Sequence, residues 1–384
     1  MKKISILCCL LAVLTAIFTV NTVKIDARAD EVVFGSSRSA LLLDSESGTI
    51  VYEKNSNDRR QIASMVKIMT LNLIFEEVEA GNVSLDEGIN VSEYATSMGG
   101  SQAFLDAHCS YKAEELVKSI IVASANDSCV AMAERISGEV GAFVQRMNEK
   151  ASEWGMDNTN FVNCTGLPAP NQYSCAKDVS IMMRKLLKHE KFFEYAKVWM
   201  FDFIHPSGRK TELSNTNKLV RFYNGCDGGK TGFTQEAMSC LSATAKRGDT
   251  RLVCVVMGSP DAKSRNAEVS KLLDYGFANY ESKTFLRGGE ELSDEVKVEG
   301  GKSNSTLGVV ESNLSAFTKR GENKDFEVIT EYFPLTAPVK QGNVIGEVRL
   351  VKNGEIIAKS NILSKYTVEK ENYLDIIDKI VEKW

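Results

Sequence analysis

Three pairs in this sequence place a serine three residues before a lysine: Ser64 and Lys67, Ser174 and Lys177, and Ser207 and Lys210. Residues three apart lie on the same face of a helix, so such a lysine can reach the serine hydroxyl. If burial or a nearby cation lowers the pKa of the lysine, the neutral amine can accept the serine proton, and the serine becomes a nucleophile. Serine and lysine are common residues, so pairs with this spacing also arise by chance.

The surroundings distinguish the three pairs. The pair at Ser207 follows a proline and contains a glycine, which is typical of a turn. The pair at Ser174 leads into a helical pattern, which is typical of an N-cap serine. The pair at Ser64 opens a helix predicted over residues 64–80, because apolar residues then recur at spacings of three and four. For Ser64 both interpretations stay open: a helix cap, or a nucleophile with its own base.

Two further short motifs follow along the chain. Ser124-Ala125-Asn126 ends an amphipathic helix predicted over residues 111–124, and Lys230-Thr231-Gly232 lies at the start of a predicted strand. Each motif alone has an ordinary structural interpretation, as a helix end or as a strand with a turn. The three motifs together, in this order and in these settings, favour a serine active site with lysine as its base.

Other catalytic systems have little support in the sequence. The chain has three histidines, and none lies near a G-x-S-x-G motif or within an H-E-x-x-H motif. The cysteines from Cys109 onward show no C-x-x-C spacing and no neighbouring histidine pair, so no metal site and no cofactor are predicted. Most of these cysteines are expected to be buried packing residues. Cys164 and Cys175, which flank one loop, are the pair considered for a disulfide.

With these motifs in place, the chain resembles the low-molecular-mass penicillin-binding proteins, which are serine-type D-Ala-D-Ala carboxypeptidases. That class carries S-x-x-K, an S-x-N element and K-T-G. The resemblance covers nearly the whole chain after the first thirty residues. Its segments are "LLLDSESGTIVYEKNSNDRRQIASMVKIMT", "IVASANDSCVAMAE", "GCDGGKTGFTQEAMSCLSATAKRGDTRLVCVVMGSP" and "TAPVKQGNVIGEV".

The resemblance implies a role for each motif residue. Ser64 attacks the carbonyl between the two terminal D-alanines and forms an acyl-enzyme, with Lys67 as the general base. Ser124 relays the proton towards the departing D-alanine, and Asn126 holds the substrate amide. Penicillin is expected to acylate Ser64 and to leave slowly.

The resemblance also implies how the substrate is bound. Lys230 places positive charge near the substrate, Thr231 hydrogen-bonds its carboxylate, and Gly232 completes the motif. The backbone N–H groups of Ser64 and Phe233 form the oxyanion hole. Arg265 has two open interpretations: it attracts the terminal carboxylate, or it is a solvated helix arginine.

Two alternatives to a carboxypeptidase remain open. A class A β-lactamase needs a glutamate past the second motif to activate water, and "NTNFVNCTGLPAP" in that region contains none. Such enzymes also lack a β-rich second domain. A secreted module that binds peptidoglycan or penicillin without catalysis is the other alternative, although all three motifs are intact.

The first residues have the layout of a secretory signal peptide. Two lysines precede an apolar run over residues 4–20, and a small-residue site ends at Ala29. Cleavage there is expected to export the protein to the outer face of the cytoplasmic membrane, to the cell wall or to the medium. An uncleaved anchor is the alternative. The net charge of −5 argues against a nucleic-acid partner.

The order of predicted elements is strands, then helices, then strands, which predicts an α/β (α+β type) fold with an antiparallel sheet flanked by helices. This is a β-lactamase/transpeptidase-like arrangement, and a small all-β domain is expected to follow it. The predicted divisions are a signal peptide (1–29), a peptidase domain (30–281), a β-rich domain (282–365) and an amphipathic helix (366–384).

The predicted C-terminal helix has a broad apolar face that ends in Trp384. It resembles the membrane-surface anchor of the family, which would give a peripheral membrane contact. Its polar face carries more acidic than basic residues, whereas interfacial helices usually have a basic face. A helix packed on the β-rich domain is therefore an equal alternative.

Overall fold

The computed structural model describes residues 34–322, 325–375 and 377. The predicted signal peptide lies outside the described residues. Within them, no helix combines the length and the apolar character needed to cross a membrane.

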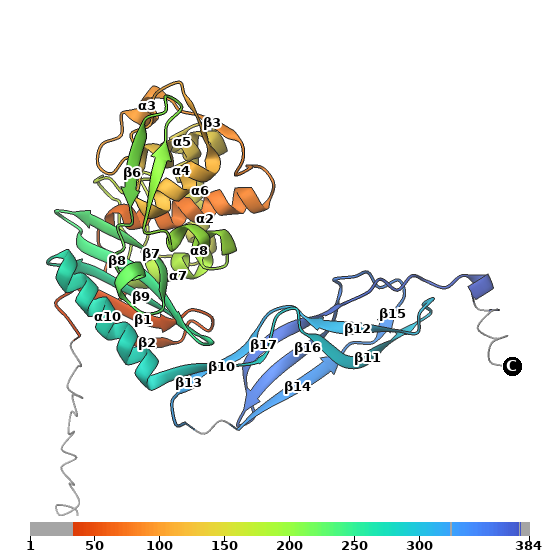
Figure 1. Ribbon diagram of the computed structural model, residues 1–384. Helices are drawn as coiled ribbons and strands as arrows, with labels where there is room; N and C mark the ends of the chain where they lie inside the picture. The colour runs from red at the N-terminus through yellow and green to blue at the C-terminus, as the bar shows by residue number, and fades with distance from the viewer. Residues whose placement is uncertain (1–33, 323–324, 376, 378–384) are drawn as a thin grey trace, which may run out of the picture. The chain divides into compact units, whose positions relative to one another are not determined.

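The central sheet has five strands in the order β2-β1-β9-β8-β7, and all neighbours are antiparallel (Figure 1). The strands are β1 (Ser39–Asp44), β2 (Ile50–Lys54), β7 (Cys226–Thr234), β8 (Met238–Arg247) and β9 (Thr250–Ser259). The N-terminal hairpin therefore joins the three later strands, with Leu42 opposite Cys254. This confirms the predicted antiparallel sheet.

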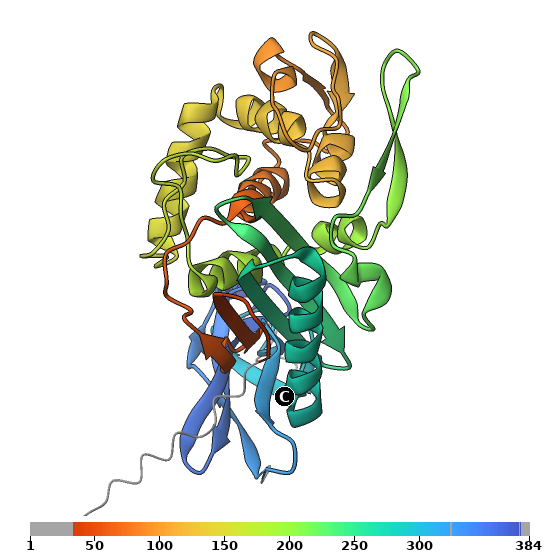
Figure 2. The ribbon, with the colours of Figure 1, turned by 90° about the vertical axis from the view of Figure 1, so that its left-hand side faces the viewer.

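Helices cover both faces of this sheet, which explains the continuous apolar run of β9. Val253, Val255 and their neighbours on one side face the main helical core, to which α7 (Ala176–Leu186) contributes. Leu252 points to the opposite face, where it meets Gly276 of α10 (Ala262–Asn279). Figure 2 shows α10 lying along the sheet. A strand buried on both sides needs apolar residues at successive positions rather than at alternate ones.

The helical region lies between the two parts of the sheet in the sequence. Besides α7, its members are η1 (Ala63–Val66), α2 (Lys67–Glu79), α3 (Glu93–Thr96), α4 (Ala113–Val122), α5 (Asn126–Ser137), α6 (Val140–Glu153), α8 (Glu190–Ala196) and α9 (Leu219–Phe222). Every residue from Lys67 to Phe75 in α2 is buried, so this helix runs through the interior. A charged residue at the start of such a helix needs a specific reason to be there.

Two short antiparallel strand pairs interrupt the helices. They pair β3 (Gly88–Asn90) with β4 (Ser110–Lys112), and β5 (Met200–Ile204) with β6 (Lys210–Ser214). The sequence does not predict β5 and β6, because most of their side chains are at least partly exposed and the apolar alternation is weak.

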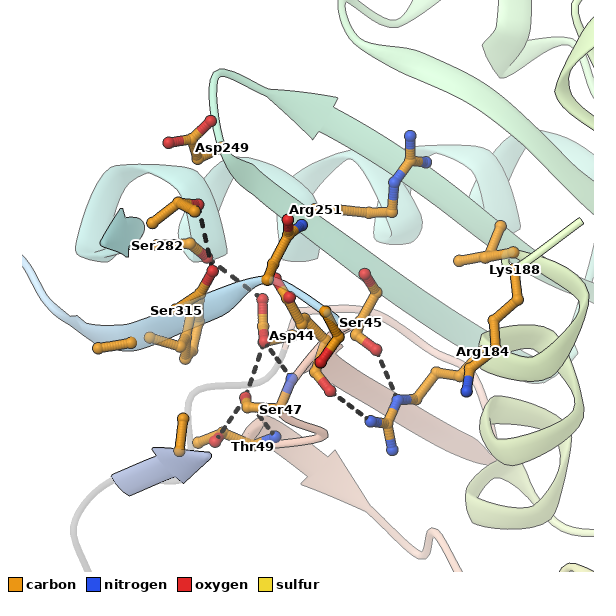
Figure 3. Close-up of a pocket in the computed structure, with 18 of the residues that line it drawn as sticks. Asp44, Ser45, Ser47, Thr49, Arg184, Lys188, Asp249, Arg251, Ser282 and Ser315 are labelled. Carbon is orange, nitrogen blue, oxygen red and sulfur yellow. Dashed lines mark hydrogen bonds between the residues drawn. The ribbon is translucent and has the colours of Figure 1, made fainter. Parts of the chain in front are cut away.

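The turn between β1 and β2 is tied to α7 (Figure 3). The Asp44 carboxylate accepts hydrogen bonds from the Ser47 backbone N–H and hydroxyl, each 2.7 Å long. Arg184 of α7 donates to the carbonyl groups of Ser45 and Glu46, also at 2.7 Å. A helix far along the chain therefore fixes this turn.

The C-terminal part is all-β, as predicted. Its strands are β10 (Tyr280–Leu286), β11 (Glu291–Glu299), β12 (Ser305–Val310), β13 (Leu314–Lys319), β14 (Phe326–Tyr332), β15 (Leu335–Thr336), β16 (Val344–Lys352) and β17 (Glu355–Ser364). One sheet pairs β10 with β13, and a second has the order β14-β16-β17-β12-β11-β15. The Asn353-Gly354 pair joins β16 to β17, and both residues have positive φ (52° and 81°), as such a two-residue hairpin turn requires.

The predicted helix over 366–384 is wrong for its first residues. Val368 forms a bridge with Val339, and Lys370 forms one with Gly301. The described helix begins at Tyr373. The early residues are held by bridges to the β-rich part, which local periodicity does not report. Residue 376 and residues 378–384 lie outside the described residues.

Candidate active site

Ser64 lies in η1, a 3-10 turn directly before α2, and not in the first turn of the α-helix itself. Val66 holds the N-cap position of α2, so the capping interpretation of Ser64 is wrong. The preceding residue, Ala63, has a φ of +46°. A non-glycine residue in this conformation is uncommon and often marks a functional site.

Lys67 is fully buried, and its amine lies between three oxygen atoms. Its Nζ is 3.1 Å from Ser64 Oγ, 2.6 Å from Asn126 Oδ1 and 2.5 Å from the Thr165 carbonyl oxygen. The amide and carbonyl oxygens can only accept hydrogen bonds. A neutral amine has two N–H groups and one lone pair, so both N–H groups are used and the lone pair is left for the Ser64 hydroxyl.

The electrostatics favour this neutral form. Burial lowers the pKa of Lys67, and the weaker effects of Cys129, Cys164 and Asp127 act in the opposite direction. The pKa of Lys230 lies well below its usual value, first because of burial and then because of repulsion from Lys67. Repulsion between two ammonium groups is mutual, so Lys67 and Lys230 resist being protonated at the same time.

Asn126 is oriented by a second contact. Its Nδ2 donates to the Gly99 carbonyl at 2.7 Å, which turns the amide oxygen towards Lys67. Asn126 is the first residue of α5, and Ser124 lies in the connection from α4. The Ser124 Oγ is buried and has no hydrogen-bond partner among the residues that the structure describes. A buried unpaired hydroxyl is costly, so it marks a place for a substrate atom or a water molecule.

The K-T-G motif lies on β7, which forms one edge of the central sheet. A Cβ atom on Gly232 would lie 2.6 Å from the Ile62 carbonyl and 3.3 Å from the Ser64 nitrogen, so only glycine fits beside Ser64. Lys230 is buried, and its Nζ donates to the Thr231 carbonyl at 3.2 Å. The structure therefore brings the second and third motifs together around Ser64 and Lys67.

The neighbouring Phe233 projects its side chain to solvent, with 68% of its surface exposed. Arg265 is not a solvated helix arginine, because only 6% of it is exposed. It donates to the Cys240 carbonyl at 3.3 Å and to Asn266 Oδ1 at 2.9 and 3.1 Å. Its charge lowers the pKa of Lys230, which places it within electrostatic reach of the site.

Sequence reasoning did not predict that the loop over residues 160–175 supports Lys67 from the other side. Asn163 Oδ1 accepts the Gly166 N–H at 2.7 Å, and this turn presents the Thr165 carbonyl to Lys67. Gly166 has a φ of +85°, and a Cβ there would collide with the Ala63 carbonyl group and lie 2.7 Å from the Ser64 nitrogen. A glycine at position 166 indicates a loop, but its contact with Ala63 and Ser64 depends on the tertiary structure.

The cysteines near the site are structural. Cys164 and Cys175, considered as a pair, are free and buried. Cys175 is the N-cap of α7, where its sulfur accepts the Asp178 N–H, so the predicted cap at Ser174 is off by one residue. Burial raises the pKa of Cys129 to about 11, which keeps this thiol protonated at neutral pH. The described residues contain no group of three side chains able to hold a metal ion.

Comparison with known proteins gives consistent matches. Residues 26–261 match the D-alanyl-D-alanine carboxypeptidase family, and residues 280–370 match the C-terminal domain of penicillin-binding protein 5. The chain is 38% identical to D-alanyl-D-alanine carboxypeptidase DacF of Bacillus subtilis over 94% of this chain and 93% of that protein. It is 30% identical to the Escherichia coli K12 protein DacA over 90% and 87% of the two chains.

Solved structures agree with these matches. The structure of penicillin binding protein 5 from Haemophilus influenzae superposes with a TM-score of 0.68 at 32% identity, over 88% of this chain and 98% of that chain. DacD from Francisella tularensis gives a TM-score of 0.66 at 27% identity, over 88% and 94%.

Proposed function

Because the chain belongs to the D-alanyl-D-alanine carboxypeptidase family, we propose that it removes the terminal D-alanine from peptidoglycan stem peptides through an acyl-enzyme on Ser64. The observation that carries this proposal is the arrangement around Lys67. Asn126 Oδ1 and the Thr165 carbonyl bind the buried amine, and its Nζ lies 3.1 Å from Ser64 Oγ. In the neutral amine these two acceptors take both N–H groups and leave the lone pair for the Ser64 hydroxyl. This is the geometry that a general base needs.

In the proposed acylation, Lys67 takes the proton of Ser64 while Oγ attacks the carbonyl carbon of the penultimate D-alanine. The backbone N–H groups of Ser64 and Phe233 bind the oxyanion. The C–N bond to the terminal D-alanine then breaks, and the leaving nitrogen receives a proton through Ser124. Water later cleaves the ester and restores the hydroxyl. The unpaired Ser124 Oγ supports its place in this path.

The terminal carboxylate of the substrate is proposed to bind on the β7 side. Thr231 supplies a hydroxyl there, and Lys230 and Arg265 supply positive charge. A carboxylate next to Lys230 would favour its protonated form. Substrate binding would thus place the proton on Lys230 and leave Lys67 neutral, since the buried pair resists two charges.

β-Lactams are proposed to acylate Ser64 by the same route. The β-lactamase alternative has no observation in its favour, because the loop over residues 158–170 that supports Lys67 contains no glutamate to activate water. A stable acyl-enzyme with penicillin is therefore expected.

For the whole chain we propose export after removal of residues 1–29, a peptidase domain over 30–281, a β-rich domain over 282–365 and a C-terminal segment over 366–384. We propose that this last segment contacts the membrane surface, because Tyr373 and Leu374 are 76% and 69% exposed. Deleting residues 366–384 and fractionating cells tests the contact. An unchanged membrane fraction would contradict it.

The main test is release of D-alanine from a diacetyl-Lys-D-Ala-D-Ala peptide, followed with labelling by fluorescent penicillin. Ser64→Ala should abolish both signals. Ser207→Ala is the matched control, because Ser207 belongs to another serine-lysine pair in the exposed turn between β5 and β6, and it should leave both signals unchanged. D-Alanine release that persists in Ser64→Ala would refute the proposal. Wild-type protein that binds peptidoglycan without releasing D-alanine would favour a non-catalytic module.

A further inference from the structure

The loop over residues 99–106 wraps around the start of α5. Its Ser101 carbonyl accepts the Asn126 N–H, and its Gly99 carbonyl accepts the Asn126 side-chain amide, both at 2.7 Å. A Cβ on Gly100 would lie 2.9 Å from that amide and 3.6 Å from Leu167. The loop is therefore packed against the residue that orients Lys67, at the rim of the active site.

Phe104 in this loop combines two unfavourable features. Its φ is +62°, a left-handed conformation that bulky L-residues rarely adopt. Its ring is also largely in water, since 56% of the residue is exposed. A phenylalanine that served only to pack the protein interior would have neither a positive φ nor an exposed ring. Strain of this kind persists where surrounding contacts enforce it, and it often accompanies a binding site.

The enforcing contacts come from a buried carboxylate. Asp127, next to Asn126 in α5, is 1% exposed. Its two oxygens accept the N–H groups on either side of Phe104, from Ala103 at 3.0 Å and from Leu105 at 3.1 Å. Both of those flanking residues are buried. With its neighbours fixed inside, Phe104 is turned outward.

A second element holds the same residue from the outside. Arg209, at the tip of the β5–β6 hairpin, donates to the Phe104 carbonyl at 2.7 Å and to Asp106 at 2.9 Å. β5 and β6 both contact α4, and Figure 1 shows β6 near that helix. The conformation of Phe104 is thus fixed by α5 and by a hairpin distant in the sequence.

A second exposed ring belongs to the strand that carries the third motif. Phe233 lies on β7, directly after Gly232, which lies against the Ser64 backbone. Phe104 lies on the loop that binds Asn126. Both segments are therefore tied to the Ser64–Lys67 pair, because Lys67 contacts both Ser64 and Asn126.

We propose that Phe104 is a specificity residue whose ring contacts an apolar group on the acyl part of the substrate, the part that stays on Ser64 after the leaving group departs. The ligand class is an acyl donor with an aliphatic or aromatic substituent near the scissile bond. This inference rests on the proposed acylation of Ser64. Water-exposed aromatic rings held rigidly lose little conformational entropy when they bind such groups.

The test compares two acylating agents that share the β-lactam ring. Benzylpenicillin carries an aromatic acyl side chain, and 6-aminopenicillanic acid carries none. Phe104→Ala should lower the second-order rate constant of acylation by benzylpenicillin about tenfold, the size expected for an aromatic contact with its buried area. It should change the constant for 6-aminopenicillanic acid by less than about twofold. Phe104→Tyr, which keeps the ring, should retain the wild-type ratio of the two constants.

Phe333→Ala is the matched control, because Phe333 is also exposed (44%) and lies in the β-rich part. If Phe104→Ala lowers the acylation rate constants of both agents equally, so that their ratio is unchanged, Phe104 has a structural role and the proposal is overturned. Phe104→Gly adds an independent check, since glycine accepts the positive φ: the ratio should fall as in Phe104→Ala, while the melting temperature stays at or above that of the wild type. Failure of wild-type protein to be acylated by either agent would instead overturn the proposed function.

Discussion

Replacing Asn126 with aspartate should raise the pKa of Lys67 and move catalysis to higher pH. The amide oxygen of Asn126 lies 2.6 Å from Lys67 Nζ, so Asn126→Asp places a carboxylate against a buried amine with almost no change in shape. In the wild-type protein burial lowers the pKa of Lys67. A nearby negative charge favours the protonated amine, which cannot accept the proton of Ser64.

The magnitude follows from the short distance and the burial. At an effective dielectric constant of about 20, unit charges about 4 Å apart interact by about 4 kcal/mol, which corresponds to about 3 pKa units. Opposite charges at such distances commonly shift a pKa by about 1 to 3 units. A shift of about 2 units would lower the neutral fraction of Lys67 about 100-fold at any pH well below the pKa that Lys67 has in the wild type.

The assay is the pH profile of acylation by benzylpenicillin. In the wild type the rate constant should rise with pH as Lys67 loses its proton, and this rise should occur below the usual lysine pKa. In Asn126→Asp the rising limb should move to higher pH by about 1 to 3 units, with recovery of activity at alkaline pH.

Two variants complete this experiment. Asn126→Ala removes the amide without adding charge, so it should lower the plateau rate without the same alkaline displacement of the limb. Asn171→Asp adds the same charge in the exposed part of the loop after Gly166 and should leave the profile unchanged. If the Asn126→Asp limb coincides with that of the wild type, the assignment of Lys67 as the base oriented by Asn126 is wrong.

Three further outcomes are expected. Gly166→Ala should lower benzylpenicillin acylation about 100-fold or more, because its Cβ would collide with Ala63 and displace the nucleophile; near-wild-type labelling would contradict this. Burial lowers the pKa of His205, so its imidazole binds a proton more readily in the unfolded chain than in the folded protein. The free energy of unfolding should therefore be highest above about pH 6.5 and should fall as the pH is lowered. In urea unfolding, His205→Gln should show a smaller dependence on pH than the wild type. Iodoacetamide at neutral pH should modify Cys109, which is partly exposed, ahead of the buried cysteines, and acylation should be retained; rapid loss of acylation through Cys129 would contradict its raised pKa.

Much of the architecture was readable from local patterns. The apolar run over residues 250–259 indicates a strand, and the Asn353-Gly354 pair indicates a tight hairpin turn. The order of elements predicts a sheet flanked by helices, and the comparison with solved structures supports that fold. These predictions succeed because periodicity and turn chemistry are local properties of the chain.

The surroundings of the candidate site residues could not be predicted in this way. Nothing near Lys67 in the sequence indicates that the Thr165 carbonyl and the Asn126 amide oxygen hold its amine. Ser64 was open to two interpretations until its 3-10 turn placed Val66 at the cap. The turn at Ser207 was predicted, but the strands β5 and β6 beside it were not, and neither was the contact between Arg209 and Phe104.

By itself, the sequence determined which groups are available for chemistry, in which order, and on which kinds of element: a serine and a lysine at a helix start, Ser124 and Asn126 between helices, and K-T-G on a strand. The tertiary structure alone decided which of three serine-lysine pairs is buried among acceptors, and therefore which lysine has a lowered pKa. Desolvation and hydrogen-bond geometry depend on loops brought from about 60 to 100 residues away. Local spacing carries no information about those loops.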